Sequence, residues 1–301
     1  MNPAMTLGAP TLRVRDLRPL LEFYVDKLGM TGKRDERQGQ RRVDLRFVGH
    51  PEPLLSLIED PNARIPPPDF AGLYHYAALV PDRSSLASTL SALVKSKVSF
   101  EGFADHQVSE SLYLHDAEHN GIEIYADRPR DKWMDWRKIS AKVAETGDLS
   151  LMSPMSQPLD YQSLLSELKA DSRSSPRPFP SGARIGHVHL RVTDLRRSVR
   201  FYNEVLGLEI MMDVPQIGAA FLSAGGYHHH LGLNTWQSAD GAPHEERDAG
   251  LDEFSVTVPD EATLREIQKR APSAETKDGG LLVRDPDGIR ISITLPRVRL
   301  A

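Results

Sequence analysis

The sequence predicts an α+β fold made of four copies of one module, in which a strand and a helix are followed by three strands. The main observation is an internal repeat: LGAPTLRVRDLRPLLEFYVDKLG (7–29) matches IGHVHLRVTDLRRSVRFYNEVLG (185–207) at an offset of 178 residues. GLYHYAALVPD (72–82) and GLDEFSVTVPD (250–260) share this offset, and HDAEHNGIEI (115–124) resembles RDPDGIRISI (284–293). The chain therefore contains two related halves, and each half contains two modules.

The third module justifies this order of elements most clearly. HVHLRV (187–192) alternates polar and apolar residues, as a half-buried strand does. Thr193 or Asp194 can then cap a helix, because a side-chain oxygen accepts hydrogen bonds from the free N–H groups of the first turn. Gly207 is expected to end that helix in a left-handed conformation. Three strands are expected to follow, over LEIMMD (208–213), GAAFLSAGG (218–226) and HHHLGLNTW (228–236).

The four modules are expected at about 7–60, 72–126, 185–236 and 250–297. We predict an N-terminal domain over residues 1–140, a linker over 141–183 and a C-terminal domain over 184–301, with two modules in each domain. The linker is rich in Ser and Pro and contains one helical segment, DYQSLLSELKA (160–170). A tether of this length would permit modules to pair across the two halves.

The composition excludes several classes of protein. A net charge of −5 is unlike a general nucleic-acid binder, which is normally basic. We find neither an apolar run long enough to span a membrane nor the pattern of a secretory signal, so we expect a cytoplasmic protein without membrane contact. The absence of cysteine means that any metal must be held by His, Asp or Glu. The oligomeric state is open, and a homo-oligomer is one option.

Four such modules, with GHVHLRVTDLRRSVRFYNEVLG (186–207) opening the third, resemble the vicinal oxygen chelate superfamily. This superfamily includes glyoxalase I, extradiol catechol dioxygenases and antibiotic-resistance proteins. The resemblance covers nearly the whole chain apart from the linker. It implies that the four modules form two cup-shaped mixed sheets, with a divalent metal on the floor of a cup. The metal ligands would come from the first and last strands of the paired modules.

The second module carries a more specific motif. ADHQVSESLYLHDAEHNGIE (104–123) resembles the fingerprint of the extradiol dioxygenases. Five residues fall in register with that fingerprint: His106, Leu112, Tyr113, Asp116 and Glu123. Three residues depart from it at turn positions, Ala104 and His119 for glycine and Ala117 for proline, so the geometry of the turn is in question.

Carried over position by position, the resemblance implies a metal triad of His75, Glu123 and His187. Two histidines and a carboxylate are the ligands of many non-haem Fe(II) oxygenases, so Fe(II) is the expected metal and Mn(II) the second candidate. His229 aligns with the family's acid–base histidine, which would take a proton from a catechol. His106 and Tyr113 match residues that hydrogen-bond the substrate. The expected activity is therefore extradiol cleavage of a small aromatic diol with O₂.

Two further expectations follow from these positions. The proposed triad is split between the halves, which favours pairing of module two with three and of module one with four. Conventional pairing would instead gather His187, His229, Glu253 and Ser292 in one cup. Within the triple histidine, neighbours on a strand point to opposite faces. We therefore expect His229 to face the metal, and His228 and His230 to face away from it.

Two other functions remain open at this point. A glyoxalase-like isomerase or lyase would use the same fold, although glyoxalase I has a glutamate ligand where this chain has His229. A metal-free protein that binds a drug or an aromatic ligand is the third hypothesis. Taken alone, His75 also fits an ordinary hydrogen-bonded core histidine, His106 a surface residue and Tyr113 a core tyrosine. The ligand interpretation depends on the whole set of residues.

Overall fold

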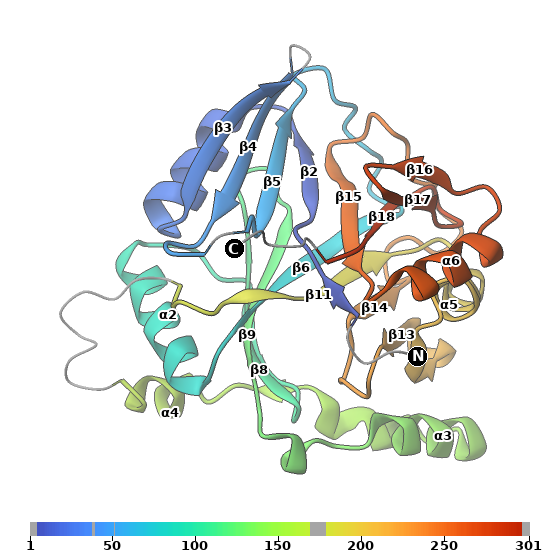
Figure 1. The fold of residues 1–301 in the computed structure, drawn as a ribbon. Helices are drawn as coiled ribbons and strands as arrows, with labels where there is room; N and C mark the ends of the chain where they lie inside the picture. The colour runs from blue at the N-terminus through green and yellow to red at the C-terminus, as the bar shows by residue number, and fades with distance from the viewer. Residues whose placement is uncertain (1–4, 38–39, 51, 169–178, 297–301) are drawn as a thin grey trace. The chain divides into compact units, whose positions relative to one another are not determined.

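The computed structural model describes residues 5–37, 40–50, 52–168 and 179–296 (Figure 1). The chain forms two units: one comprises 14–61 and 75–186, the other 1–13, 62–74 and 187–301. We call them the 75–186 unit and the 187–301 unit. The division passes through strands β2 (Thr11–Val14), β6 (Gly72–Val80) and β11 (Arg184–Arg191), which begin modules one, two and three.

The 75–186 unit contains the remaining strands of modules one and two. Module one forms the antiparallel strands β3 (Thr31–Arg37), β4 (Gln40–Arg46) and β5 (Leu55–Glu59). Module two forms β7 (Gly102–Asp105), β8 (Ser109–His115) and β9 (Gly121–Asp127), and β9 runs parallel to β6. Helices α1 (Leu17–Leu21), continued by η1 (Glu22–Lys27), and α2 (Arg83–Lys95) follow the first strands.

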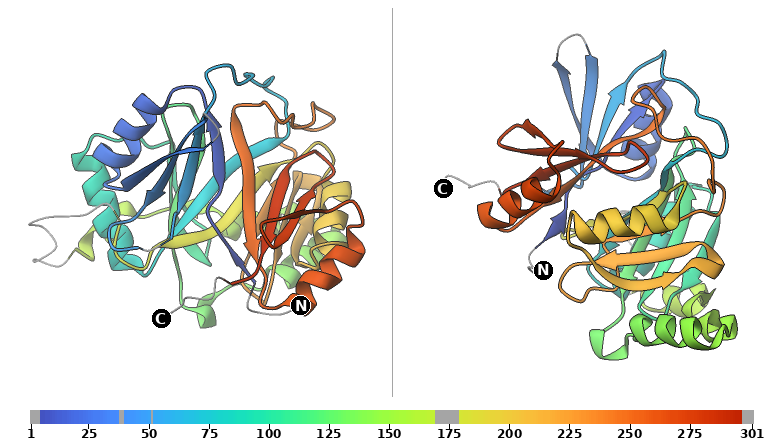
Figure 2. Two further views of the ribbon diagram at one scale, coloured as in Figure 1. Left: turned by 45° about the horizontal axis from the view of Figure 1, so that its top comes forward. Right: turned by 90° about the vertical axis from the view of Figure 1, so that its right-hand side faces the viewer.

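The 187–301 unit repeats this arrangement. Module three forms α5 (Leu195–Glu204), β12 (Glu209–Val214), η5 (Pro215–Ile217), β13 (Ala219–Ser223) and β14 (Leu231–Asn234), and α5 packs on β12, β13 and β14 (Figure 2). Module four forms β15 (Gly250–Thr257), α6 (Glu261–Arg270), β16 (Glu275–Lys277), β17 (Gly280–Arg284) and β18 (Arg290–Thr294). The short strand β1 (Thr6–Leu7) pairs with β15. The predicted α+β fold of four modules is thus confirmed.

An aspartate begins the helix of every module, which is the local reason for the repeated order. The side chains of Asp16, Asp82, Asp194 and Asp260 accept hydrogen bonds from N–H groups in the first turns of α1, α2, α5 and α6. These carboxylates satisfy donors that a helix N-terminus otherwise leaves free. The expected cap of α5 is therefore Asp194, and Gly207 lies beyond its end with φ 72°.

The two nine-stranded sheets pair modules as the split triad predicted. Their orders are β16-β17-β18-β15-β2-β5-β4-β3, with β1 beside β15, and β10-β7-β8-β9-β6-β11-β14-β13-β12. Within the 187–301 unit, β2 pairs with β15, and Arg191 of β11 donates a hydrogen bond of 3.0 Å from Nη2 to the carbonyl oxygen of Leu73 in β6. Module one therefore lies beside module four, and module two beside module three.

The segment between the halves has more structure than the one helix expected for it. Its elements are η2 (Arg130–Lys132), α3 (Trp136–Thr146), η3 (Leu149–Met155), β10 (Gln157–Pro158) and α4 (Tyr161–Ser166). The expected helix corresponds to α4, which packs on α2, and β10 adds to the edge of β7. Part of the predicted linker, 169–178, lies outside the described residues. Among the described residues, no helix combines the length and apolar character needed to cross a membrane.

Candidate metal centre

His75 and Glu123 approach each other from adjacent parallel strands. Glu123 of β9 is in register with Ala77 of β6, two residues after His75, so both side chains leave the same face of the sheet. His75 Nε2 lies 3.0 Å from Glu123 Oε2, and the two side chains are only 7% and 4% exposed. A buried carboxylate is costly without a cationic or hydrogen-bonding partner, and this pair provides one.

His187 of β11 completes a group of three ligand-type side chains. One ligand atom from each of His75, Glu123 and His187 lies within 4.8 Å of the others, and all three residues are buried. Metal bonds of about 2.1 Å at right angles would separate neighbouring ligand atoms by about 3 Å, which the 3.0 Å between His75 and Glu123 matches. The donor set and its spacing fit a divalent first-row metal such as Fe(II), Mn(II) or Zn(II).

The equivalent positions of module four are neutralised by protein cations instead. Ser292 of β18 is in register with Ser255 of β15, two residues after Glu253, as Glu123 is with Ala77. Ser292 Oγ donates to Glu253 Oε1 at 2.7 Å, while Lys277 Nζ and Arg290 Nη2 lie 2.7 and 3.3 Å from Glu253 Oε2. Here a carboxylate stands at the position equivalent to His75, and protein cations compensate its charge.

His229 lies beside the proposed ligand His187. Their ring centroids are 4.1 Å apart, and His229 is 7% exposed. The expectation that the triple histidine forms a strand is wrong, because β13 ends at Ser223 and β14 begins at Leu231. Gly225 and Gly226 take the left-handed φ values of 65° and 68° and turn the chain there. The alternation expected of a strand therefore does not apply to these three histidines.

His106 and Tyr113 form a hydrogen-bonded pair next to Glu123. Tyr113 of β8 lies directly opposite Glu123 in the antiparallel register, and its ring centroid is 5.7 Å from that of His75. His106 Nε2 is 2.7 Å from Tyr113 Oη, and its Nδ1 is 3.0 Å from the carbonyl oxygen of Met155. Since a carbonyl only accepts, Nδ1 carries a proton, and the Nε2 of a neutral His106 accepts from the tyrosine hydroxyl.

The turn between β8 and β9 keeps its shape despite its unusual residues. His119 has φ 63°, and Gly288, its counterpart 169 positions later in module four, has φ 88°. A histidine in this left-handed region costs about 1 kcal/mol relative to glycine. Asp116 holds the turn by accepting from the N–H groups of Glu118 and Asn120, each at 2.9 Å. The departure from glycine therefore leaves the geometry intact.

A buried tyrosine supports each of these two turns. Tyr24 donates to Asp116 Oδ2 at 2.9 Å, and Tyr202 donates to Asp285 Oδ2 at 2.9 Å. Burial raises the pKa of Asp116, although its hydrogen bonds oppose this shift. Burial also raises the pKa of Asp285 to about 7, with the nearby Asp287 carboxylate adding to the shift. These networks are common to both halves and fix the loops that precede the last strands.

Comparison with known proteins agrees with the fold and the site. The profile of the Glyoxalase/Bleomycin resistance protein/Dioxygenase superfamily matches residues 6–124 and 184–293. The chain belongs to this superfamily. A superfamily relative, the Catechol-2,3-dioxygenase of Bacillus subtilis (strain 168), is 36% identical over 286 residues, which are 93% of either chain.

Solved structures support the glyoxalase/dioxygenase superfamily fold. A Bacillus subtilis protein of proposed dioxygenase activity has a TM-score of 0.61 at 13% identity, covering 96% of this chain and 84% of that one. Glyoxalase I from Zea mays has a TM-score of 0.56 at 16% identity, covering 96% and 92%. At these identities the likeness concerns the fold alone. The chain thus has a relative named as a dioxygenase, and it shares its fold with glyoxalase I from Zea mays.

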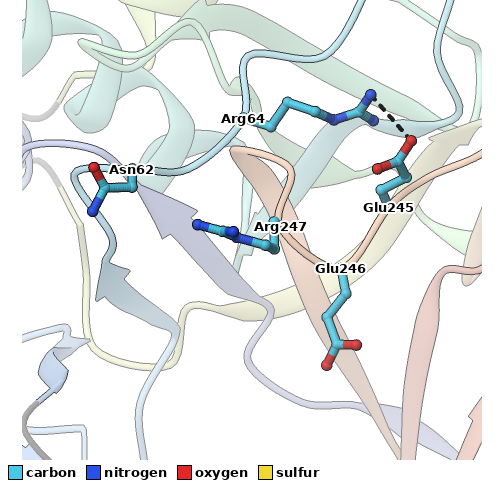
Figure 3. A pocket seen from close by; sticks show the side chains of 5 residues that line it. All are labelled: Asn62, Arg64, Glu245, Glu246 and Arg247. Carbon is cyan, nitrogen blue, oxygen red and sulfur yellow. Dashed lines mark ion pairs between the residues drawn. The ribbon is translucent and has the colours of Figure 1, made fainter.

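One surface pocket of the 187–301 unit contains none of the predicted site residues (Figure 3). It has a volume of about 540 Å³ and is lined by Asn62, Arg64, Glu245, Glu246 and Arg247. Arg64 Nη1 lies 3.1 Å from Glu245 Oε1, and Arg64 Nε lies 2.6 Å from Oδ1 of the buried Asp248. The acidic and basic side chains that line the pocket largely compensate one another, so we assign the pocket no role.

Proposed function

We propose that the protein is an extradiol ring-cleaving dioxygenase that acts on a small aromatic diol. The observation that carries this proposal is the buried group of His75, Glu123 and His187, with a further histidine, His229, in ring contact with His187. The relative that is 36% identical and named Catechol-2,3-dioxygenase supports the same chemistry. We propose Fe(II) as the metal, with Mn(II) as the second candidate, because the ligand set accepts both.

A metal held by these three ligands would act as a Lewis acid on the adjacent diol oxygens and leave a further position open for O₂. We assign His229 the role of proton acceptor for one diol hydroxyl, and later of donor of that proton to an oxygen atom derived from O₂. Such acid–base assistance is worth about 10²–10⁴ in rate. A neighbouring aromatic ring, Phe221, has its centroid 4.6 Å from that of His229 and would limit the freedom of the diol ring.

Tyr113 and His106 would also orient the substrate. The Tyr113 hydroxyl donates to His106 Nε2, so its oxygen keeps lone pairs that can accept from a substrate hydroxyl. The contact of His106 with the Met155 carbonyl holds the histidine ring in one orientation. This pair can therefore relay a proton without a change of ring position. We assign it substrate binding and proton relay.

The test is aerobic turnover by protein loaded with Fe(II) under anaerobic conditions. The loaded protein is mixed with a panel of catechols and hydroquinones while O₂ consumption and the absorbance of the product are followed. We expect O₂ uptake with at least one diol and a coloured ring-opened product. Bound metal without O₂ uptake across the panel would contradict the proposal. Isomerisation of a thiohemiacetal would then point to a glyoxalase-like enzyme, and absence of metal binding to a metal-free binding protein.

A further inference from the structure

The three consecutive histidines differ in their contacts. His228 Nδ1 lies 2.8 Å from His229 Nδ1, and these residues are 3% and 7% exposed. His230 contacts β13 instead, through its own Nδ1. We infer that His228 is a positioning residue that fixes the tautomer and ring orientation of His229. This inference rests on the proposed function, since it assigns His229 the acid–base role.

The short contact between two imidazole nitrogens admits only two neutral arrangements. One nitrogen must carry the proton and the other must present its lone pair. If His228 were the donor, the proton of neutral His229 would be on Nε2, and that atom could not accept a proton from a substrate. If His229 is the donor, its Nε2 carries a lone pair instead of a proton. Only the second arrangement makes His229 a base at Nε2.

The same arrangement also serves the protonated form. After His229 has taken a proton on Nε2, its Nδ1–H still donates to His228, so the ring need not move between the two states. A carboxylate has this role behind the histidine of hydrolytic triads, where it selects the tautomer and holds the ring. Here a neutral imidazole would select the tautomer without adding a negative charge.

Contacts between tilted aromatic rings hold His228 in place. The Tyr227 ring lies 4.0 Å from the His228 ring at an interplanar angle of 35°, and 5.0 Å from the His230 ring. His230 Nδ1 accepts from the Ala224 N–H at 3.2 Å and lies 2.9 Å from Ser223 Oγ, at the end of β13. The contacts therefore run from the sheet through His230 and Tyr227 to His228. This gives each histidine of the triplet a separate role.

The matched test compares His228→Asn with His228→Leu. An asparagine Oδ1 occupies nearly the place of a histidine Nδ1 and accepts a hydrogen bond, whereas leucine has a similar size and no acceptor. In the Fe(II)-loaded protein, we expect His228→Leu to lower kcat about 10- to 100-fold, with KM and metal content unchanged. His228→Asn should recover most of this loss. The surface variant His50→Asn serves as the control.

A second readout uses the metal-free protein and does not depend on activity. ¹⁵N NMR of histidine-labelled protein at about pH 8, where a histidine of ordinary pKa is neutral, reports which ring nitrogen is protonated. The His229 signals are assigned by their loss in His229→Gln. We expect a protonated Nδ1 in the wild type and in His228→Asn, and a shift toward protonated Nε2 in His228→Leu.

Each result bears on the inference separately from the proposed function. A protonated Nε2 on His229 in the wild type would overturn the inference, and so would equal kcat values for the leucine and asparagine variants. If the loaded wild type consumed no O₂ with any diol, the proposed function would fail, while the NMR comparison would still decide the tautomer. Urea denaturation shows whether the two variants are destabilised. An equal loss of stability in both variants would indicate a structural role for His228 and would count against a positioning role.

Discussion

Glu123 and Glu253 are carboxylates at ligand positions of the two cups, and they should respond to substitution in opposite ways. Glu123→Gln removes the anionic member of the proposed ligand set while keeping the shape of the side chain. Changes to groups that merely support a metal ligand cost about 10–100-fold in affinity, so loss of the ligand itself should cost at least about 100-fold. This corresponds to about 2.7 kcal/mol of binding free energy.

The effect on folding follows from linkage between metal binding and stability. At a free metal concentration of 100 times the wild-type Kd, binding adds about 2.7 kcal/mol to the free energy of unfolding. If the affinity of Glu123→Gln is 100-fold lower, the same concentration adds about 0.4 kcal/mol. The metal-free variant also loses the carboxylate that pairs with His75, so the gain on addition of metal is measured from the metal-free stability of each protein.

Glu253→Gln supplies the matched control. Its carboxylate pairs with Lys277 and Arg290, whose side chains are 37% and 16% exposed, so its loss removes one counter-charge from each cation. Arg290 keeps a second carboxylate, that of Asp252, at 3.5 Å. We expect the metal-free variant to lose about 1–2 kcal/mol, since solvent screens part of the interaction. Its gain on addition of metal should equal that of the wild type.

The assay is urea denaturation with and without Mn(II), which is stable in air, together with calorimetric titration of Mn(II). Metal binding that persists in Glu123→Gln, or that is lost equally in Glu253→Gln, would contradict the assignment of Glu123 as the carboxylate ligand. The first result would exclude Glu123 as a ligand. The second would mean that both cups contribute to metal binding.

Three further predictions concern the surrounding residues. Tyr113→Phe should lower kcat about 10–100-fold without changing metal content, because it removes the hydroxyl 2.7 Å from His106; steady-state kinetics and metal analysis check this. Asp285→Asn should gain stability relative to the wild type, by up to about 4 kcal/mol, as pH rises from about 4 to 7. Burial raises the pKa of Asp285 in the folded wild type from 3.8 to about 7, so in this window the folded state binds a proton more tightly than the unfolded chain, and the wild type loses stability as pH rises. A difference in unfolding free energy that is constant with pH would contradict it. Gly186→Ala should destabilise the fold by about 1–3 kcal/mol or more in urea denaturation, since a Cβ there would lie 1.9 Å from Tyr125 Oη.

Much of the fold could be predicted because the modules repeat local signals. The helix start at Thr193 or Asp194 and the end at Gly207 depend on neighbouring residues only, and the structure has the cap at Asp194 and a left-handed Gly207. The pairing of modules could also be predicted, because the ligand-type residues His75 and His187 stand in different halves of the chain. A sequence repeat with unequal chemistry thus contains information on long-range pairing.

Other features could not be predicted for identifiable physical reasons. No apolar residue lies between the three histidines before Leu231. Their sequence pattern therefore could not distinguish a strand from the turn that Gly225 and Gly226 produce. The partner of His106 is the main-chain carbonyl of Met155, and a carbonyl has no side-chain signature. His119 adopts the left-handed conformation expected of glycine, because the hydrogen bonds to Asp116 offset the strain.

The sequence brought the three proposed ligands into one hypothesis, and the structure brings His75, Glu123 and His187 within one small volume. Catechol dioxygenation and glyoxalase isomerisation differ in whether O₂ is consumed, and this difference can be measured directly.

Ring-cleaving dioxygenation is tested most directly by the stoichiometry of O₂ consumption by the Fe(II)-loaded protein with the diol that it turns over fastest. We expect one O₂ consumed per diol, no hydrogen peroxide, and a product whose mass equals that of the diol plus O₂, with the ring opened beside the diol carbons. We also expect Glu123→Gln to abolish this uptake. Turnover of a substrate without O₂ consumption, or uptake that persists in Glu123→Gln, would exclude a dioxygenase that uses Glu123 as a metal ligand.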